Sequence, residues 1–144
     1  MERIYGWTGR LLRVELPSGA FNETPTIDYA YDFIGGRLLA SRIYWDEVSQ
    51  ATKALDPDNV LMFLPGPLAG TQAIGCSRWV VSAKSPHSYP DQYGFGNGGG
   101  FFGAALKHSG FDGLIISGKA KSLSYILVEN EKVEIKDASF SQIY

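Results

Sequence analysis

The chain has 144 residues, the usual size of one domain, and 44% of them are hydrophobic and 13% aromatic. It can therefore bury a core and is not expected to be disordered. Thirteen Lys and Arg side chains nearly balance 15 Asp and Glu side chains, which gives a formal net charge of -2. This balance argues against a partner bound mainly by charge, so we expect neither a nucleic acid nor an anionic membrane surface as the partner.

The chain contains a single cysteine, Cys76. It can form no internal disulfide, and it cannot alone supply the several thiolates of a zinc or iron–sulfur site. No segment reaches about 18 uninterrupted apolar residues, and the start of the chain has no apolar run of signal-peptide length. These absences favour the cytoplasm as the default compartment.

Strand alternation, helical spacing of apolar residues and turn signals predict a mixed α+β domain with a mixed β-sheet, hairpins at both ends and short helices between them. The expected elements, in chain order, are strands at 9–16 and 20–26, helices at 28–34 and 37–48, strands at 60–64 and 78–85, a short helix at 101–108, and strands at 114–117, 124–128 and 133–136. Gly35 and Gly36 interrupt the helical pattern and indicate a break or a close backbone approach. The segment PGPLAGT, residues 65–71, is predicted to be a rigid loop because proline fixes φ.

The stretch GFGNGGGFFG, residues 94–103, places bare backbone beside aromatic rings. Glycines let backbone N–H groups approach a ligand, and a glycine run that opens a helix suits an anion. Asn97 adds one carbonyl acceptor and two N–H donors, which suit a ligand heteroatom or Mg²⁺. The run matches the dinucleotide fingerprint G-x-G-x-x-G by letter, but the preceding SYPDQY is not a clean hydrophobic strand. The alternative is a glycine-rich turn that packs tightly against a neighbouring element.

A second candidate is Arg78, in the segment GCSRWVVSAKSP. An arginine that is flanked by small residues and enters a strand could present its planar fork to a phosphate. The alternative is an ordinary surface arginine. Trp7, Trp45 and Trp79 are expected to be core or interface anchors.

Several segments together resemble the N-terminal domain of the aldehyde ferredoxin oxidoreductases, the tungsten–pterin enzymes. In chain order they are YGWTGRLLRVEL, FIGGRLLASRIYWDEV, NVLMFLPGPLAGT, SRWVVSAKSP, GNGGGFFGAALKHSGFDGLIISGKA and VENEKVEIKDAS. The resemblance extends from residue 5 to about residue 140. It implies that residues 1–144 form a single, incomplete pterin-binding domain, which is one half of the duplicated N-terminal domain of that family. The family commonly has a glycine where this chain has Leu38, which implies an altered backbone approach there.

In that family the domain supports a tungsten or molybdenum ion held by two pterin dithiolenes, whose phosphates are bridged by Mg²⁺. By resemblance, Arg78 corresponds to the arginine that binds pterin phosphate. Asn97 corresponds to the asparagine whose backbone carbonyl contacts Mg²⁺, and Gly99 to a glycine with backbone contact to the pterin. Phe101 and Phe102 are expected to anchor the following helix in the core. No residue of the chain is expected to be catalytic.

The resemblance implies oxidation of an aldehyde to a carboxylic acid, with electrons passed through a [4Fe-4S] cluster to ferredoxin. The cluster ligands would lie on later helical domains, so we expect the isolated chain to be inactive. Its partners would be those C-terminal domains or a partner subunit, ferredoxin, and a second copy in a homodimer. The alternatives are a stand-alone, non-catalytic module that binds a pterin or another phosphate ligand, a small subunit of a split oxidoreductase, and a nucleotide-binding protein.

Overall fold

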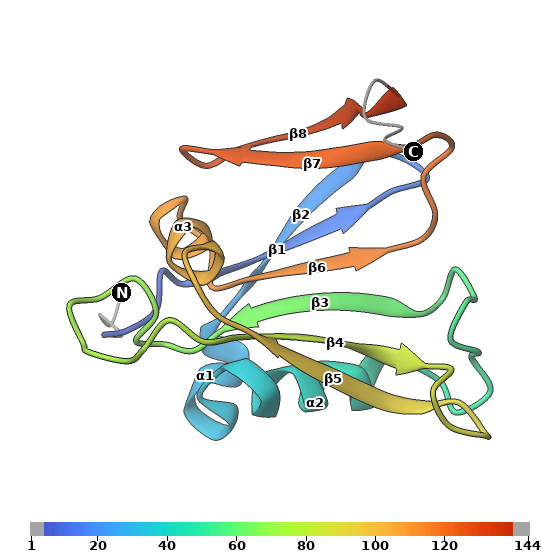
Figure 1. Cartoon of the computed structure of the whole chain (residues 1–144), viewed down its shortest axis with the longest axis horizontal. Coiled ribbons are helices and arrows are strands. Elements are labelled where there is room, and N and C mark those ends of the chain that lie inside the picture. The colour runs from blue at the N-terminus through green and yellow to red at the C-terminus, as the bar shows by residue number, and fades with distance from the viewer. Residues whose placement is uncertain (1–4, 140–144) are drawn as a thin grey trace.

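A computed structural model describes residues 5–139 and forms a six-stranded mixed β-sheet, a separate two-stranded hairpin and three helices within that range (Figure 1). The elements are β1 (Arg10–Glu15), β2 (Ala20–Pro25), α1 (Ile27–Phe33), α2 (Gly36–Glu47), β3 (Val60–Pro65), β4 (Trp79–Ser85), β5 (Gln92–Gly98), α3 (Phe102–His108), β6 (Gly113–Ser117), β7 (Ser124–Glu129) and β8 (Lys132–Asp137). The predicted fold class, with a hairpin at each end, is confirmed. Within the described range, no helix has the length and apolar character that crossing a bilayer requires.

The strand order of the large sheet is β2-β1-β6-β3-β4-β5. Strand β6 is parallel to β1 and antiparallel to β3, and the remaining neighbours are antiparallel. The N-terminal hairpin and the β3–β4–β5 meander therefore meet only through β6, which enters the sheet after α3. The centre of the sheet thus joins segments that are far apart in the sequence.

Helices α1 and α2 cover one face of this sheet (Figure 1). On α2, Leu39, Ala40 and Ile43 are buried and belong to the same cluster as Leu11 of β1 and Met62 of β3. Full burial of a side chain of this size contributes about 1.5–3 kcal/mol relative to leaving it exposed. This cluster fixes α2 against the middle strands of the sheet.

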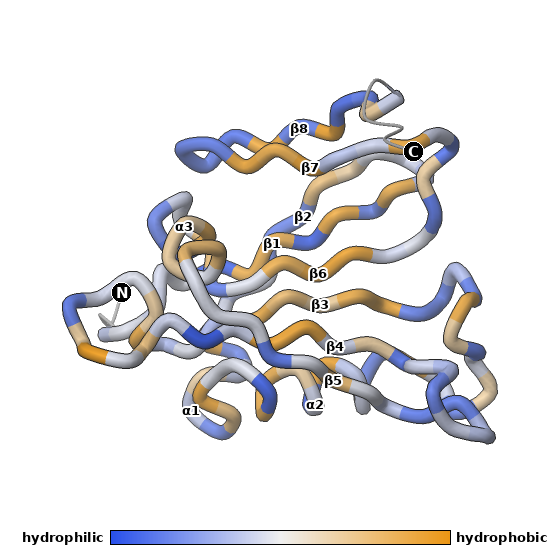
Figure 2. Tube along the Cα trace, viewed as in Figure 1, coloured by the Kyte–Doolittle hydropathy of each residue, from blue (hydrophilic) through white to orange (hydrophobic). Residues whose placement is uncertain are grey.

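Helix α3 and the β7–β8 hairpin pack on the opposite face. Leu12 follows Leu11 directly and belongs to this second cluster, because successive strand residues project to opposite faces. The apolar side chains of the hairpin that contact this cluster are Ile126, Val128, Val133 and Ile135. Figure 2 shows the corresponding apolar stretches on β7 and on the central strands. A two-stranded hairpin is marginal in water, so this packing is what stabilises it.

The predicted interruption at Gly35 and Gly36 is confirmed. A Cβ placed on Gly35 would lie 3.2 Å from Pro67 Cδ, and Gly36 has a φ of +55° at the start of α2. Leu38 is 56% exposed, so the close backbone approach at this junction is made by Gly35 and not at position 38. The junction therefore brings the start of α2 against the loop at residues 65–71.

The first half of the glycine stretch is a strand, which corrects the expectation of a loop that leads directly into a helix. Gly94, Gly96 and Gly98 lie in β5 and pair with β4. A Cβ on Gly94 would lie 2.7 Å from Ser85 Cβ, and one on Gly98 would lie 2.2 Å from Trp79 Cζ2. The glycines therefore make room for β4 side chains, as the tight-packing alternative predicted. The dinucleotide fingerprint is wrong here, since it requires a strand-to-helix turn at these glycines.

Candidate functional site

The structure brings Arg78, Asn97 and Gly99 together at one end of the β4–β5 pair. Trp79 is paired with Gly98 and Val80 with Asn97, so Arg78 and Gly99 are the next residues along the two adjacent strands. All three predicted site residues are exposed. The surface they form, which we call the glycine-end surface, consists of Arg78, Asn97, Gly99 and Gly100.

The Asn97 side chain lies on the face of the sheet that α1 and α2 cover. It is directly opposite Val80, and opposed residues of an antiparallel pair project to the same side. Because strand side chains alternate between the two faces, Ser82 and Lys84 project to the same face as Val80. Lys84 Nζ donates to the Gln50 carbonyl, just beyond the end of α2, at 2.8 Å. Asn97 therefore presents its amide on one side of β5 and its backbone at the end of the strand.

The Arg78 guanidinium is available for an anion. It forms no ion pair with any of residues 5–139, although its main chain is fixed, because the Gly66 N–H donates to the Arg78 carbonyl at 3.4 Å. An exposed arginine without a carboxylate partner keeps its full planar fork for a phosphate oxygen pair. Both readings of Arg78 from the sequence, a phosphate-binding arginine and an ordinary surface arginine, are compatible with this geometry.

The two residues that follow β5, Gly99 and Gly100, have no side chains. A Cβ placed on Gly99 or Gly100 would meet no atom within 4 Å, and Gly100 has a φ of +77° that L side chains rarely adopt. The Gly99 carbonyl accepts a hydrogen bond of 3.1 Å from Trp79 Nε1. A flat ligand could therefore approach the main chain at Gly99 without meeting a side chain.

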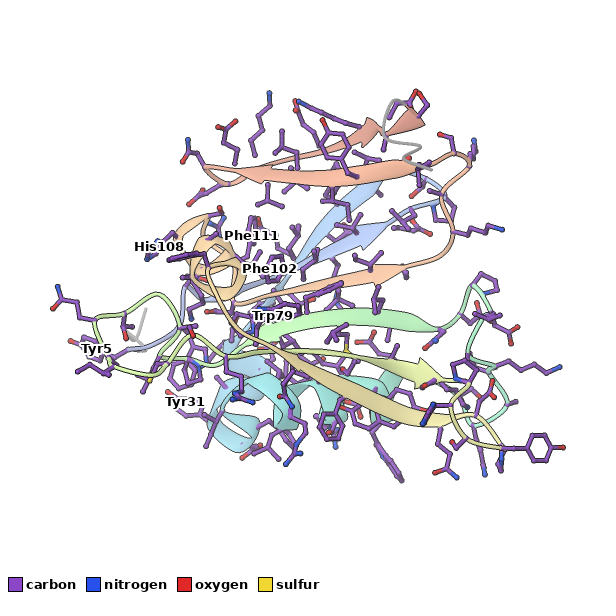
Figure 3. The ribbon with its side chains drawn as sticks, in the orientation of Figure 1. Tyr5, Tyr31, Trp79, Phe102, His108 and Phe111 are labelled. Carbon is purple, nitrogen blue, oxygen red and sulfur yellow. The ribbon has the colours of Figure 1, made fainter. Side chains whose placement is uncertain are left out.

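Next to Arg78 in the chain, Trp79 forms an aromatic cluster with Phe63 and Phe102. Figure 3 shows Trp79 and Phe102 near each other. The ring centroids of Trp79 and Phe102 are 4.8 Å apart. Phe102 contacts Phe63 and Trp79 at the start of α3 but is 40% exposed, and Phe101 is 90% exposed, so the prediction that these two rings anchor the helix in the core is wrong. Trp45 is also no core residue, being 79% exposed.

The loop at residues 65–71, beside Arg78, is held by three separate parts of the chain. A Cβ on Gly6 would lie 3.4 Å from Pro67 Cβ, and Gly35 approaches the same proline from the α1–α2 junction. From α3, the His108 ring nitrogen Nε2 lies 2.9 Å from the Gly70 carbonyl oxygen. These contacts come from residues distant in the sequence and add to the restriction of φ by the two prolines, so the rigidity of the loop remains a prediction.

A buried ion pair supports the same end of the sheet and was missed from the sequence. Lys107 Nζ lies 2.5 Å from Asp112 Oδ1, and the two side chains are 7% and 2% exposed. Asp112 also accepts from the Thr8 and Gly9 backbone N–H groups at 2.8 Å and from Thr26 Oγ1 at 2.7 Å. The pair thereby ties the start of the chain to the turn between α3 and β6. The lysine and aspartate stand only five positions apart, but nothing local marks them as buried.

The fold is that of an α+β domain, and one end of its sheet places Arg78, which has no ion-pair partner among residues 5–139, next to main chain without side chains. The chain belongs to the family described as aldehyde ferredoxin oxidoreductase, N-terminal domain, whose family model matches residues 11–142. The resemblance inferred from the sequence is confirmed.

Named oxidoreductases are similar to the chain in sequence. The tungsten-containing aldehyde ferredoxin oxidoreductases of Pyrococcus horikoshii and Pyrococcus furiosus are 37% and 38% identical over 94% of this chain. The aliphatic sulfonate oxidoreductase, WOR-like subunit, of Pyrococcus furiosus is 37% identical over the same share. In each case the chain spans 22% of the length of the relative.

A solved structure supports the fold. The active-site complex BamBC of benzoyl coenzyme A reductase, in complex with 1,5-dienoyl-CoA, contains a chain that matches with a TM-score of 0.90 and 37% sequence identity. The match covers 94% of this chain and 21% of that one. This region is therefore a recurring N-terminal unit in larger oxidoreductases.

Proposed function

We propose that this chain is the N-terminal cofactor-binding part of a tungsten- or molybdenum-pterin aldehyde:ferredoxin oxidoreductase. Residues 1–144 would form half of a duplicated pterin-binding domain. The observation that carries the proposal is that Arg78, which has no ion-pair partner among residues 5–139, lies at the same end of the β4–β5 pair as the open backbone of Gly99.

The residues present fit such a cofactor. Arg78 has the planar donor fork that suits a pterin phosphate, and Gly99 and Gly100 have open space where any side chain would obstruct a flat ring. Asn97 would offer its backbone carbonyl to Mg²⁺, which prefers oxygen ligands. The glycine-end surface thus combines charge, an oxygen donor and access to the main chain.

The chemistry divides between the cofactor and the chain. When bound, the metal–pterin group would supply the redox chemistry that converts an aldehyde to a carboxylic acid. Arg78 would balance phosphate charge, Gly99 would set the distance of the ring from the main chain, and the loop at residues 65–71 would hold Arg78 in place. Electrons would leave through a [4Fe-4S] cluster and ferredoxin, both held by polypeptide outside this chain, so the isolated chain would be inactive.

The names of the relatives support a cofactor role for this region. They refer to an aldehyde ferredoxin oxidoreductase, an aliphatic sulfonate oxidoreductase and a benzoyl coenzyme A reductase complex, yet each matches this chain at 37–38% identity. A region shared by proteins with such different substrates is better suited to holding a common group than to selecting a substrate.

The words "subunit" and "complex" in two of those names favour a second arrangement, in which the chain acts with a separately encoded partner. The cofactor would then be completed by a partner subunit and not by later domains of one polypeptide. Co-purification of a tagged protein from its source distinguishes the two arrangements: one band of full enzyme length supports the first, and a stoichiometric second chain supports the other.

Arg78→Ala in the complete natural protein is expected to lower the pterin and metal content per protein about 10-fold or more. A charge-assisted hydrogen bond contributes about 1.5–3 kcal/mol, and loss of the bidentate pair removes two of them. Arg78→Lys should give an intermediate loss, because an ammonium retains the charge but not the fork. Metal analysis by mass spectrometry and fluorescence of the released, oxidised pterin measure both quantities.

The control is Arg42→Ala, which removes an exposed arginine of α2 that pairs with Asp46 away from the glycine-end surface. It should leave pterin and metal content unchanged. Equal cofactor content in the Arg78→Ala and Arg42→Ala proteins would contradict the assignment of Arg78.

A further inference from the structure

We propose that Trp79 is a positioning residue that shapes the main chain of the glycine-end surface for its ligand. This inference rests on the proposed function, since the ligand it concerns is the pterin cofactor. It assigns a role to a side chain that does not itself belong to that surface. Trp79 makes three contacts that support this role: a hydrogen bond, a close approach to the main chain and an aromatic contact.

The hydrogen bond fixes a residue that lies just beyond the strand. Strand β5 ends at Gly98, which is paired with Trp79, so Gly99 is the first residue outside the strand. The Trp79 indole N–H reaches over this pair and donates to the Gly99 carbonyl at 3.1 Å. The bond therefore orients the Gly99 peptide just beyond the end of the strand.

The close approach explains why position 98 carries no side chain. A Cβ on Gly98 would lie 2.2 Å from Trp79 Cζ2 and 2.3 Å from Cε2, well inside contact distance for carbon atoms. The indole thus lies directly on the Gly98 main chain. Any larger residue at 98 would push the ring away and break its bond to Gly99.

The aromatic contact fixes the other side of the ring. Trp79 packs against Phe102, the first residue of α3, and a Cβ on Gly103 would lie 3.5 Å from Trp79 Cβ (Figure 3). One indole therefore contacts both ends of the turn that links β5 to α3. Because Arg78 precedes Trp79 directly, the same side chain also fixes the main chain that carries the phosphate-binding guanidinium.

The test uses Trp79→Phe in the complete natural protein. Phenylalanine keeps a ring beside Phe63 and Phe102 but has no N–H group for Gly99. In protein freed of cofactor, we expect amide hydrogen exchange over residues 98–102 to become about 2- to 10-fold faster, which is what one hydrogen bond of this kind is worth. In protein purified from cells that supply the cofactor, we expect pterin and metal content to fall several-fold.

The matched control is Trp7→Phe. Trp7 makes the same kind of bond, from its indole Nε1 to the Ile34 carbonyl at 2.8 Å, at the α1–α2 junction. It should leave the exchange of residues 98–102 unchanged, and this is the readout compared between the two tryptophan variants. If Trp7→Phe speeds the exchange of residues 98–102 as much as Trp79→Phe does, the effect is a general consequence of losing an indole hydrogen bond. That result would overturn the inference.

A second pair of variants keeps Trp79 in place. Gly98→Ala should displace the indole and reproduce the faster exchange and the loss of pterin. Gly94→Ala introduces a comparable clash in the same strand, 2.7 Å from Ser85 Cβ, but away from Trp79. It should change neither readout. This pair keeps the test valid if Trp79→Phe folds poorly.

The readouts separate two kinds of failure. Unchanged exchange or unchanged pterin content in both Trp79→Phe and Gly98→Ala overturns the role of Trp79. A wild-type protein that carries no pterin overturns the proposed function, and this outcome does not depend on how the variants exchange. Faster exchange together with lost pterin, absent from both controls, supports the inference.

Discussion

Asp112→Ala is expected to lower the free energy of unfolding by about 3–5 kcal/mol, because it leaves the Lys107 ammonium buried without its counter-charge. The substitution also removes the acceptor for the Thr8 and Gly9 N–H groups and for the Thr26 hydroxyl. Chemical denaturation followed by circular dichroism measures the change. The start of the chain should become the first region to lose protection from amide exchange.

The control is Asp46→Ala, which breaks the partly exposed Arg42–Asp46 pair of α2. Surface pairs of this kind contribute about 0–1 kcal/mol. A double variant, Lys107→Met with Asp112→Leu, should recover part of the stability by removing both charges, but not the part due to the lost backbone acceptors. Equal losses in Asp112→Ala and Asp46→Ala would contradict the role assigned to the buried pair.

Phe111→Ala is expected to lower the free energy of unfolding by about 3–5 kcal/mol, since truncation of a buried phenylalanine leaves a cavity. Phe111 is 1% exposed and belongs to the cluster beneath α3 and the β7–β8 hairpin. The Arg10 guanidinium lies 5.1 Å from the centre of its ring and would lose this contact as well. Denaturant titration of the variant and the wild type measures the difference.

Phe101→Ala is the matched control, because Phe101 is 90% exposed. It should change the free energy of unfolding by less than about 0.5 kcal/mol. The two variants remove the same side chain from positions ten residues apart, so the difference between them reports the burial of Phe111 together with its contact with Arg10. Similar losses in both would place Phe101 in the core after all.

Local patterns predicted most elements correctly. The N-terminal hairpin is recognisable because strand residues surround a Pro-Ser-Gly turn, and α2 because apolar residues recur with helical spacing over a long enough segment. The β7–β8 hairpin has alternating apolar residues on either side of a short turn. In each case neighbouring residues supply both the pattern and the reason for it.

Strand β5 was not predicted, because glycine is unfavourable in strands and the three glycines obscured the pattern. Tyr93 and Phe95 do alternate with those glycines, and this was the available signal. The strand forms because Ser85, Val81 and Trp79 of β4 occupy the space over the glycines. Its stability therefore depends on a partner strand that no local window contains.

The fold class and the candidates Arg78 and Asn97 could be inferred from residue patterns, whereas the family and Gly99 came from motif resemblance. The folded structure was needed to show that Arg78 and Gly99 flank the paired residues Trp79 and Gly98 at one end of β4 and β5, that Lys107 and Asp112 form a buried pair, and that Trp79 lies on Gly98. The physical reason is that propensity and periodicity depend on residues close in the chain. Strand register, burial of charge and side-chain packing depend on contacts between segments that only the folded sheet brings together.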